Sequence, residues 1–154
     1  MDGPRPRRRG VRRAVAAGDG ATPRSLTVVV DTPIFIDHLR GDERARDLLH
    51  EGFASRRRLV ASVMTRVEVL AGMRASEKTA TYGLLSLFEW IPVDEAVADR
   101  AGRTARQYLR SHPGVDPVDF VIAATAEAMD AELWTRNQKH FPMLPDLTDP
   151  YAGR

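Results

Sequence analysis

The sequence predicts an α/β protein, a three-layer α/β/α sandwich with a mostly parallel, roughly five-stranded sheet. Short apolar runs rich in valine, leucine and isoleucine alternate along the chain with longer segments whose apolar residues recur at helical spacing. The run LTVVV is apolar without polar alternation, which is typical of a strand covered on both faces. Alternating strands and helices therefore indicate βαβ units around one buried sheet.

The expected strands are short. Four segments fit, namely residues 26–30, 59–62, 91–93 and 132–135. A fifth strand is expected near Leu147. Six segments have helical periodicity: residues 33–39, 42–54, 65–73, 76–90, 94–112 and 116–130.

Individual residues support several of these helices. In residues 42–54, one face collects four apolar side chains, namely Ala45, Leu48, Leu49 and Phe53. In residues 76–90, Ser76 is expected to cap the helix, and Tyr82, Leu85 and Phe88 are expected to point inward. The helix at 116–130 is nearly apolar and is therefore expected to be buried.

The charge is divided unevenly between two parts of the chain. Residues 1–25 contain seven arginines and two aspartates, a net charge of +5, whereas the remainder has 16 basic and 19 acidic residues, a net charge of −3. The first 25 residues lack a periodic apolar face, so we expect a basic disordered extension followed by a single domain over residues 26–154. The extension could be a basic arm, an unstructured segment or the product of a mis-called start codon.

Composition excludes several kinds of protein. The 154 residues contain no cysteine, so disulfides, zinc–thiolate sites and cysteine nucleophiles are absent. No stretch approaches the roughly 18 apolar residues of a membrane span, and the apolar run AVAAG is too short for a signal peptide. We therefore expect a cytoplasmic protein without a membrane partner.

Three carboxylates and one amide stand out by position. Asp31 follows the first strand, Glu68 lies in the first turn of the helix after the second, and Asp119 lies in the first turn of the buried helix. Asn137 follows the fourth strand. Sites in parallel sheets form outside the carboxyl ends of the strands, so these side chains are expected to meet there.

Each acid also has a structural explanation. Asp31 can cap the helix that follows it, Thr65 and Glu68 match a capping box, and Asp119 follows the Asp116–Pro117 helix start. Burying several carboxylates together is nevertheless costly unless a cation compensates. Converging carboxylate oxygens are the ligands that Mg²⁺ prefers, and the ion keeps water molecules of its own. Metal-assisted hydrolysis is therefore the chemistry that the acids favour.

Four blocks of the sequence resemble the motifs of PIN-domain proteins, most closely the VapC-type toxins of bacterial toxin–antitoxin pairs. The blocks are VVVDTPIFID, SVMTRVEVLAG, PVDFVIAATA and LWTRNQKHF, and the resemblance covers residues 26–148. It implies a three-layer α/β/α fold and a ribonuclease that depends on Mg²⁺, with Mn²⁺ as the alternative ion. It also implies a homodimer, an RNA substrate and a co-expressed cognate antitoxin that keeps the enzyme inactive.

The resemblance also assigns roles to residues. It implies that Asp31, Glu68 and Asp119 hold the metal, and that Asn137 completes the catalytic set by orienting water or substrate. It places substrate contacts at Thr32 and Thr135, and the basic residues beside Asn137 are expected to meet phosphates, namely Arg136 and Lys139. His140 stands where relatives often have Asp, which favours one ion over two.

Two further points stay open at this stage. Four arginines on the expected helix 94–112 form one basic stripe, either a solvated face or a surface for phosphates: Arg100, Arg103, Arg106 and Arg110. The rival to a ribonuclease is a catalytically inactive PIN-like module that binds nucleic acid or protein and whose acids only cap helices.

Overall fold

A computed structural model describes residues 26–154. The expectations for residues 1–25 lie outside this range. Within it, no helix has the length and apolar character needed to cross a membrane.

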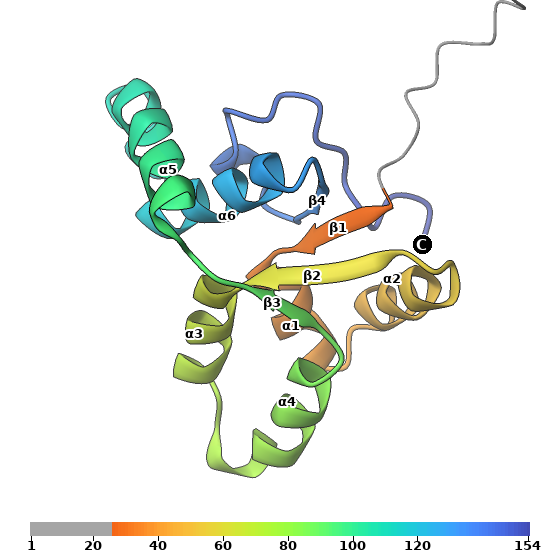
Figure 1. The fold of residues 1–154 in the computed structure, drawn as a ribbon. Helices are drawn as coiled ribbons and strands as arrows, with labels where there is room; N and C mark the ends of the chain where they lie inside the picture. The colour runs from red at the N-terminus through yellow and green to blue at the C-terminus, as the bar shows by residue number, and fades with distance from the viewer. Residues whose placement is uncertain (1–25) are drawn as a thin grey trace, which may run out of the picture.

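The centre of the fold is a parallel sheet of four short strands. The strands are β1 (Thr27–Val30), β2 (Arg58–Ser62), β3 (Glu89–Ile91) and β4 (Glu132–Trp134), in the order β3-β2-β1-β4. Residues 27–29 of β1 pair with 58–60 of β2, and residues 28–30 pair with 132–134 of β4. Because all four strands are parallel, their carboxyl ends lie at one edge of the sheet, as Figure 1 shows.

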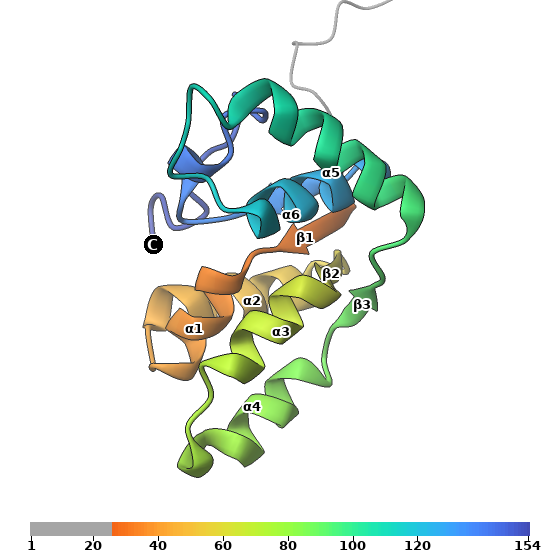
Figure 2. The ribbon, with the colours of Figure 1, turned by 90° about the vertical axis from the view of Figure 1, so that its left-hand side faces the viewer.

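The helices cover both faces of the sheet, which confirms the three-layer prediction (Figures 1 and 2). On one face lie α1 (Thr32–Leu39), α2 (Glu43–Ala54), α3 (Val63–Ala71) and α4 (Lys78–Leu85); on the other lie α5 (Glu95–Tyr108) and α6 (Pro117–Ala128). Two 3-10 turns complete the described elements, η1 (Ala75–Glu77) and η2 (Gln138–His140).

The strand residues alternate between the two cores. Val28 and Val30 pack with α1, α2 and α4, whereas Val29 packs with α6, and all three are fully buried. Successive side chains on a strand point to opposite faces, so a strand buried on both faces must be apolar at each position. This is the physical reason for the uninterrupted valines of β1.

Several predicted boundaries are wrong. The expected fifth strand near Leu147 does not form: residues 144–147 line a hollow beside β4 without pairing with it. Pro145 lies in this segment, and proline has no amide hydrogen to donate to a strand ladder. The strand expected at 91–93 is β3, at Glu89–Ile91, and the helix expected at 94–112 ends at Tyr108.

The helix expected at 76–90 is shorter than its apolar pattern suggests. It begins after a 3-10 turn and ends at Leu85, with Glu77 rather than Ser76 as the cap residue. Leu85 and Phe88 are buried as predicted, but Tyr82 is 43% exposed. Phe53, expected on the apolar face of residues 42–54, is 37% exposed, and its ring centroid lies 5.5 Å from that of Phe88.

Candidate active site

Asp31 lies at the junction between β1 and α1, at the carboxyl edge of the sheet. It is the N-cap of α1, where its Oδ1 accepts a hydrogen bond from the Thr32 amide at 2.8 Å, as the sequence predicts. Its Oδ2 accepts a second bond from the Thr135 hydroxyl at 2.7 Å. Only 3% of Asp31 is exposed. The residue therefore serves as a cap and is also held by a residue 104 positions further along the chain.

The surroundings of Asp31 disfavour its negative charge. Burial raises the pKa of the carboxyl group to about 6; the bonds from Thr135 and Thr32 oppose this shift, and the charges of Asp119 and Glu68 add to it. Two hydrogen bonds thus fail to compensate for the burial. An opposite charge nearby would favour the ionised form, so Asp31 is a carboxylate that a bound cation would stabilise.

Glu68 reaches this site through Thr32. The Thr32 hydroxyl donates a hydrogen bond to Glu68 Oε2, which joins the start of α1 to α3. The predicted capping box at Thr65 is wrong: Ser62 caps α3 by accepting from the Met64 amide at 3.2 Å, and Glu68 therefore lies in the second turn. The helix cap lies three residues earlier than predicted, which is close to one helical turn. Glu68 therefore lies on the same side of α3 as the prediction implied.

Asp119 lies in the first turn of α6 and belongs to a reciprocal capping box. Asp116 caps the helix by accepting from the Val118 amide, and Asp119 Oδ2 accepts from the Asp116 amide at 3.1 Å. The same Oδ2 lies 3.2 Å from His140 Nδ1. Burial raises the pKa of Asp119, although the bonds from Asp116 and His140 oppose this. Asp119 is thus a second acid whose charge is not fully compensated.

The loop after β4 contributes the remaining predicted residues. The Thr135 hydroxyl donates to Asp31 and accepts from the Asn137 amide at 3.0 Å, so it fixes the start of the loop. The side chains of Asn137 and Lys139 are exposed and form no hydrogen bond within residues 26–154. Both are free to contact a ligand at this edge.

Arg136 is tied to residues that the sequence did not single out. Its Nη1 donates to Asp37 Oδ2 at 2.7 Å, and its guanidinium lies over the Tyr151 ring. The Tyr151 hydroxyl donates to the same Asp37 oxygen at 3.0 Å. Asp37 is the last residue of the block VVVDTPIFID, and this position was the only indication in the sequence that it belongs to the site. No sequence pattern indicated Tyr151. The guanidinium of Arg136 is therefore fixed by Asp37 and Tyr151.

The three acids fit a hard divalent cation by their chemistry. They come from the N-cap of α1, from α3 and from α6, and none of them forms an ion pair with a lysine or arginine among the described residues. Among residues 26–154, no three histidine, aspartate or glutamate side chains lie close enough together to hold a metal ion. Glu68 is drawn to Thr32 and Asp119 to His140. The uncompensated charge at Asp31 is what a cation would neutralise.

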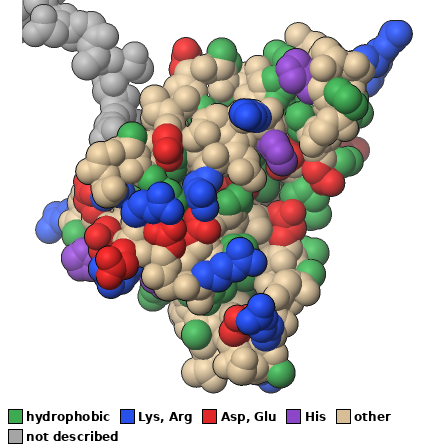
Figure 3. Space-filling view, turned by 180° about the vertical axis from the view of Figure 1, so that it is seen from behind, with side chains coloured by type: hydrophobic (Ala, Val, Ile, Leu, Met, Phe, Trp, Pro, Cys, Tyr) green, Lys and Arg blue, Asp and Glu red, His purple; other side chains and the backbone are tan. Residues whose placement is uncertain are grey.

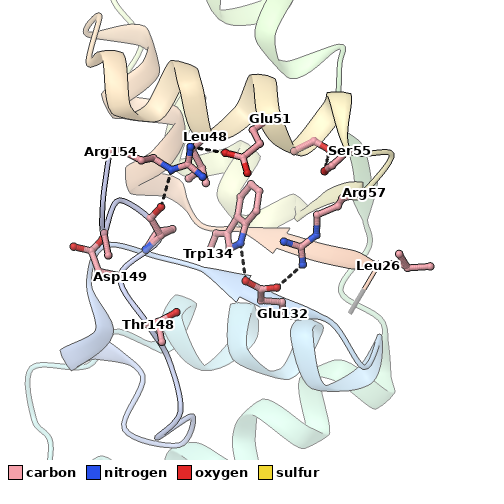
Figure 4. A pocket seen from close by; sticks show the side chains of 13 residues that line it. Leu26, Leu48, Glu51, Ser55, Arg57, Glu132, Trp134, Thr148, Asp149 and Arg154 are labelled. Carbon is pink, nitrogen blue, oxygen red and sulfur yellow. Dashed lines mark hydrogen bonds and ion pairs between the residues drawn. The ribbon is translucent and has the colours of Figure 1, made fainter. Parts of the chain in front are cut away.

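A large cavity lies elsewhere, at the amino ends of the strands. It measures about 470 Å³ and is lined by Leu26, Arg57 and Glu132, which precede or begin strands, and by the C-terminal residues. Figure 4 shows Glu132 between Trp134 and Arg57: it accepts from the Trp134 indole at 2.9 Å and pairs with Arg57. Size alone does not indicate the active site here, because the perturbed acids lie at the opposite edge.

The predicted basic stripe is interrupted at its first member, and its last member, Arg110, lies beyond the end of α5. Arg100 lies 3.4 Å from Glu127 of α6, while Arg103, Arg106 and Arg110 are exposed. On the face shown in Figure 3, basic and acidic side chains are interleaved among the described residues. That face therefore has no large surface of one sign.

Fold and site together define a parallel α/β/α protein with acidic residues gathered at the carboxyl edge of its sheet. Residues 28–144 match the family of the PIN domain. The chain is 47% identical over 123 residues to ribonuclease VapC19 of Mycobacterium tuberculosis, which covers 80% of this chain and 98% of the relative. It is 41% identical over 128 residues to ribonuclease VapC10 of the same organism, covering 81% and 93%.

A solved structure agrees with these relatives. One chain of a toxin–antitoxin complex from Klebsiella pneumoniae superimposes with a TM-score of 0.67 at 28% identity, covering 80% of this chain and 98% of the other. The chain belongs to the PIN-domain family and, within it, to the VapC proteins. The resemblance found in the four sequence blocks is confirmed.

Proposed function

We propose that this protein is a metal-dependent ribonuclease, the toxin of a toxin–antitoxin pair that a cognate antitoxin neutralises. The observation that carries the proposal is the buried Asp31, whose pKa is raised to about 6 beside two further carboxylates and without a basic partner among the described residues. Its relatives are named as ribonucleases, and a structural neighbour is named as part of a toxin–antitoxin complex.

Asp31, Glu68 and Asp119 are the residues that would hold Mg²⁺, with Mn²⁺ as the alternative. When bound, such an ion lowers the pKa of water and neutralises charge on a phosphoryl oxygen. The chain itself orients Asp31 through Thr135 and the α1 amide, and brings Glu68 to the site through Thr32. Both of these carboxylates thus arrive with their rotamers fixed by neighbouring groups.

The exposed residues of the β4 loop act on the substrate. Asn137 orients water or RNA, since an amide can donate and accept but adds no charge. Lys139 and Arg136 meet backbone phosphates, and Thr32 borders the same position, whereas the fully buried Thr135 acts through its bond to Asp31. Arg136 does so while Asp37 holds one side of its guanidinium, which leaves other donors of the fork available.

The proposal extends to organisation. Residues 26–154 form one PIN domain that contains the whole site, residues 1–25 are an extension of it, and the active form is a homodimer. Sedimentation of the purified protein at micromolar concentration, with a mass of 17.1 kDa for one chain, distinguishes a dimer from a monomer.

Cleavage of RNA by the purified chain is the direct test. Cellular RNA should be cut in the presence of Mg²⁺ or Mn²⁺, protected by excess EDTA, and cut again when the ion is restored. Asp119→Asn should cut at less than about 1% of the parental rate, which corresponds to roughly 3 kcal/mol of lost transition-state stabilisation. Glu51→Gln is the matched control, because Glu51 is an exposed carboxylate at the opposite edge of the sheet.

The outcomes separate the two candidate roles. Cleavage that survives EDTA and Asp119→Asn equally would contradict the proposal. A protein that binds RNA without cutting it under any metal would be the inactive PIN-like module instead.

The antitoxin requires a test in cells. Induction of the chain should arrest growth, and co-expression of the product of a short neighbouring reading frame should restore it. The Asp119→Asn variant should not arrest growth while it still co-purifies with that product. Arrest by the variant would show that the toxicity does not come from cleavage.

A further inference from the structure

The strongest unassigned contact at the site is the one between His140 and Asp119. His140 ends η2, and its Nδ1 lies 3.2 Å from Asp119 Oδ2. An ionised carboxylate only accepts hydrogen bonds, so Nδ1 must carry the hydrogen and donate it. No sequence pattern pointed to this pair, because the two residues are 21 positions apart and belong to different elements.

The contact divides the two oxygens of Asp119 between different tasks. Oδ2 accepts from both His140 and the Asp116 amide, whereas Oδ1 accepts no hydrogen bond from any described residue. A carboxylate bound in this way cannot rotate freely, because rotation would break two bonds at once. One oxygen is thus engaged by the protein, and the other remains available for a cation.

His140 is itself firmly placed. Its amide donates to the Asn137 carbonyl at 2.8 Å, and the next residue, Phe141, is 1% exposed and anchors the turn in the core. The side chain is 43% exposed, so the ring is fixed on the Nδ1 side and open to solvent on the other. A ring held through its backbone can orient a neighbouring carboxylate without being buried.

The same loop also orients Asp31. Thr135 begins the loop and donates to Asp31 Oδ2, and His140 lies near its end and donates to Asp119 Oδ2. One short segment thus contacts two of the three acids, each through a single side-chain donor. The loop acts as a clamp with two contact points.

We propose that His140 is a positioning residue whose Nδ1–H holds Asp119 in the orientation that binds the divalent cation. This rests on the metal site of the proposed function. Donors that orient metal ligands typically change metal affinity about 10- to 100-fold when they are removed.

Calorimetric titration of the purified full chain with Mn²⁺, without RNA, tests this role. His140→Ala should weaken Mn²⁺ binding about 10-fold or more. His140→Asn should stay within roughly 3-fold of the parent, because an asparagine amide can donate from near the Nδ1 position. His140→Gln has its amide one bond further out and should resemble the alanine variant. His112→Asn is the matched control: His112 is exposed, contacts Ser111, and should bind as the parent does.

The variants are compared in Mn²⁺ affinity and in thermal stability. Rescue by Asn but not by Gln supports positioning through Nδ1, and thermal melting of the metal-free variants must match the parent so that misfolding is excluded. Unchanged binding in His140→Ala would overturn the inference, as would equal losses in His140→Asn and His140→Ala. If Asp119→Asn abolishes Mn²⁺ binding while His140→Ala does not, the inference about His140 alone fails. If Asp119→Asn also leaves binding unchanged, the proposed metal site fails.

Discussion

The carboxylates at the two edges of the sheet have different partners. At the amino edge, Glu132 faces Arg57 and Glu51 lies 2.6 Å from Arg154, so each carboxylate has a basic partner. At the carboxyl edge, Asp31 is more deeply buried than either glutamate, yet it meets a hydroxyl, an amide and the fields of two other acids. The two glutamates at the amino edge are paired, whereas Asp31 at the carboxyl edge has no basic partner among the described residues and would be stabilised by a cation.

The largest expected effect is the difference in RNA cleavage between variants that lack a carboxylate at the carboxyl edge and at the amino edge. Asp31→Ala should lower metal-dependent RNA cleavage by at least about 1,000-fold, because it removes the central carboxylate of the site. Glu132→Ala should leave the cleavage rate of the folded fraction within about 2-fold. Rates measured on folded protein, checked by circular dichroism, make the comparison. Equal losses in the two variants would show that the edges do not differ in function.

Asp31→Asn should stabilise the metal-free protein at neutral pH. The pKa of Asp31 rises from 3.8 to about 6 on folding, so ionisation opposes folding, and the cost is present above pH 6 and disappears as the pH falls towards 4. The shift corresponds to about 3 kcal/mol. Asparagine is an equally good N-cap, so the cap is kept.

Urea unfolding in EDTA across the pH range measures this. We expect the free energy of unfolding of Asp31→Asn to exceed that of the parent by up to about 3 kcal/mol at pH 7.5, and the difference to shrink towards zero near pH 4. A variant that is less stable than the parent at pH 7.5 would mean that the acid has a structural role only.

Glu132→Ala tests the opposite edge through stability. It should cost about 2 kcal/mol, because it removes the carboxylate that both Arg57 and the Trp134 indole contact in a partly buried place. Glu89→Ala is the control: it also breaks an ion pair at the start of a strand, with Arg58, but both side chains are about half exposed, so the loss should be much smaller. Denaturant titration at pH 7.5 compares the two variants.

The smallest effect is expected from Tyr151→Phe. Loss of the bond to Asp37 should cost about 1 kcal/mol of stability and, because Asp37 also holds Arg136, should reduce RNA cleavage by roughly 3-fold. Tyr108→Phe is the control, since the Tyr108 hydroxyl forms no hydrogen bond to the described residues. If the two variants have the same cleavage rate, the Asp37 contact does not support substrate binding.

The sequence predicted best where one physical requirement decides a residue. The strand β1 must be apolar on both faces, and the caps at Asp31 and Asp116 follow from their places before Thr32–Pro33 and Pro117. The four motif blocks then identified the family. Positions with a single strong local reason could therefore be read without a structure.

The errors arose where two local signals overlap. Phe88 and Trp90 continue the apolar spacing of α4, but the chain leaves the helix through 3-10 bonds such as Leu87 to Leu84, and Trp90 enters β3. At α3, both Ser62 and Thr65 offer a hydroxyl for capping, and the end of β2 selects Ser62. The contacts of His140 with Asp119 and of Tyr151 with Asp37 depend on tertiary structure and have no signature in the sequence.

The positions of β4 and its loop in the sequence determine when the site can form during synthesis. Asp31 lies 104 positions before its partner Thr135, and the donor to Asp119 lies 21 positions after that acid, so the acids are synthesised before the residues that orient them. A growing or truncated polypeptide that stops before residue 135 contains all three acids but lacks the segment that orients two of them. The acids are therefore oriented only after the segment 135–140 has been synthesised and has folded against them.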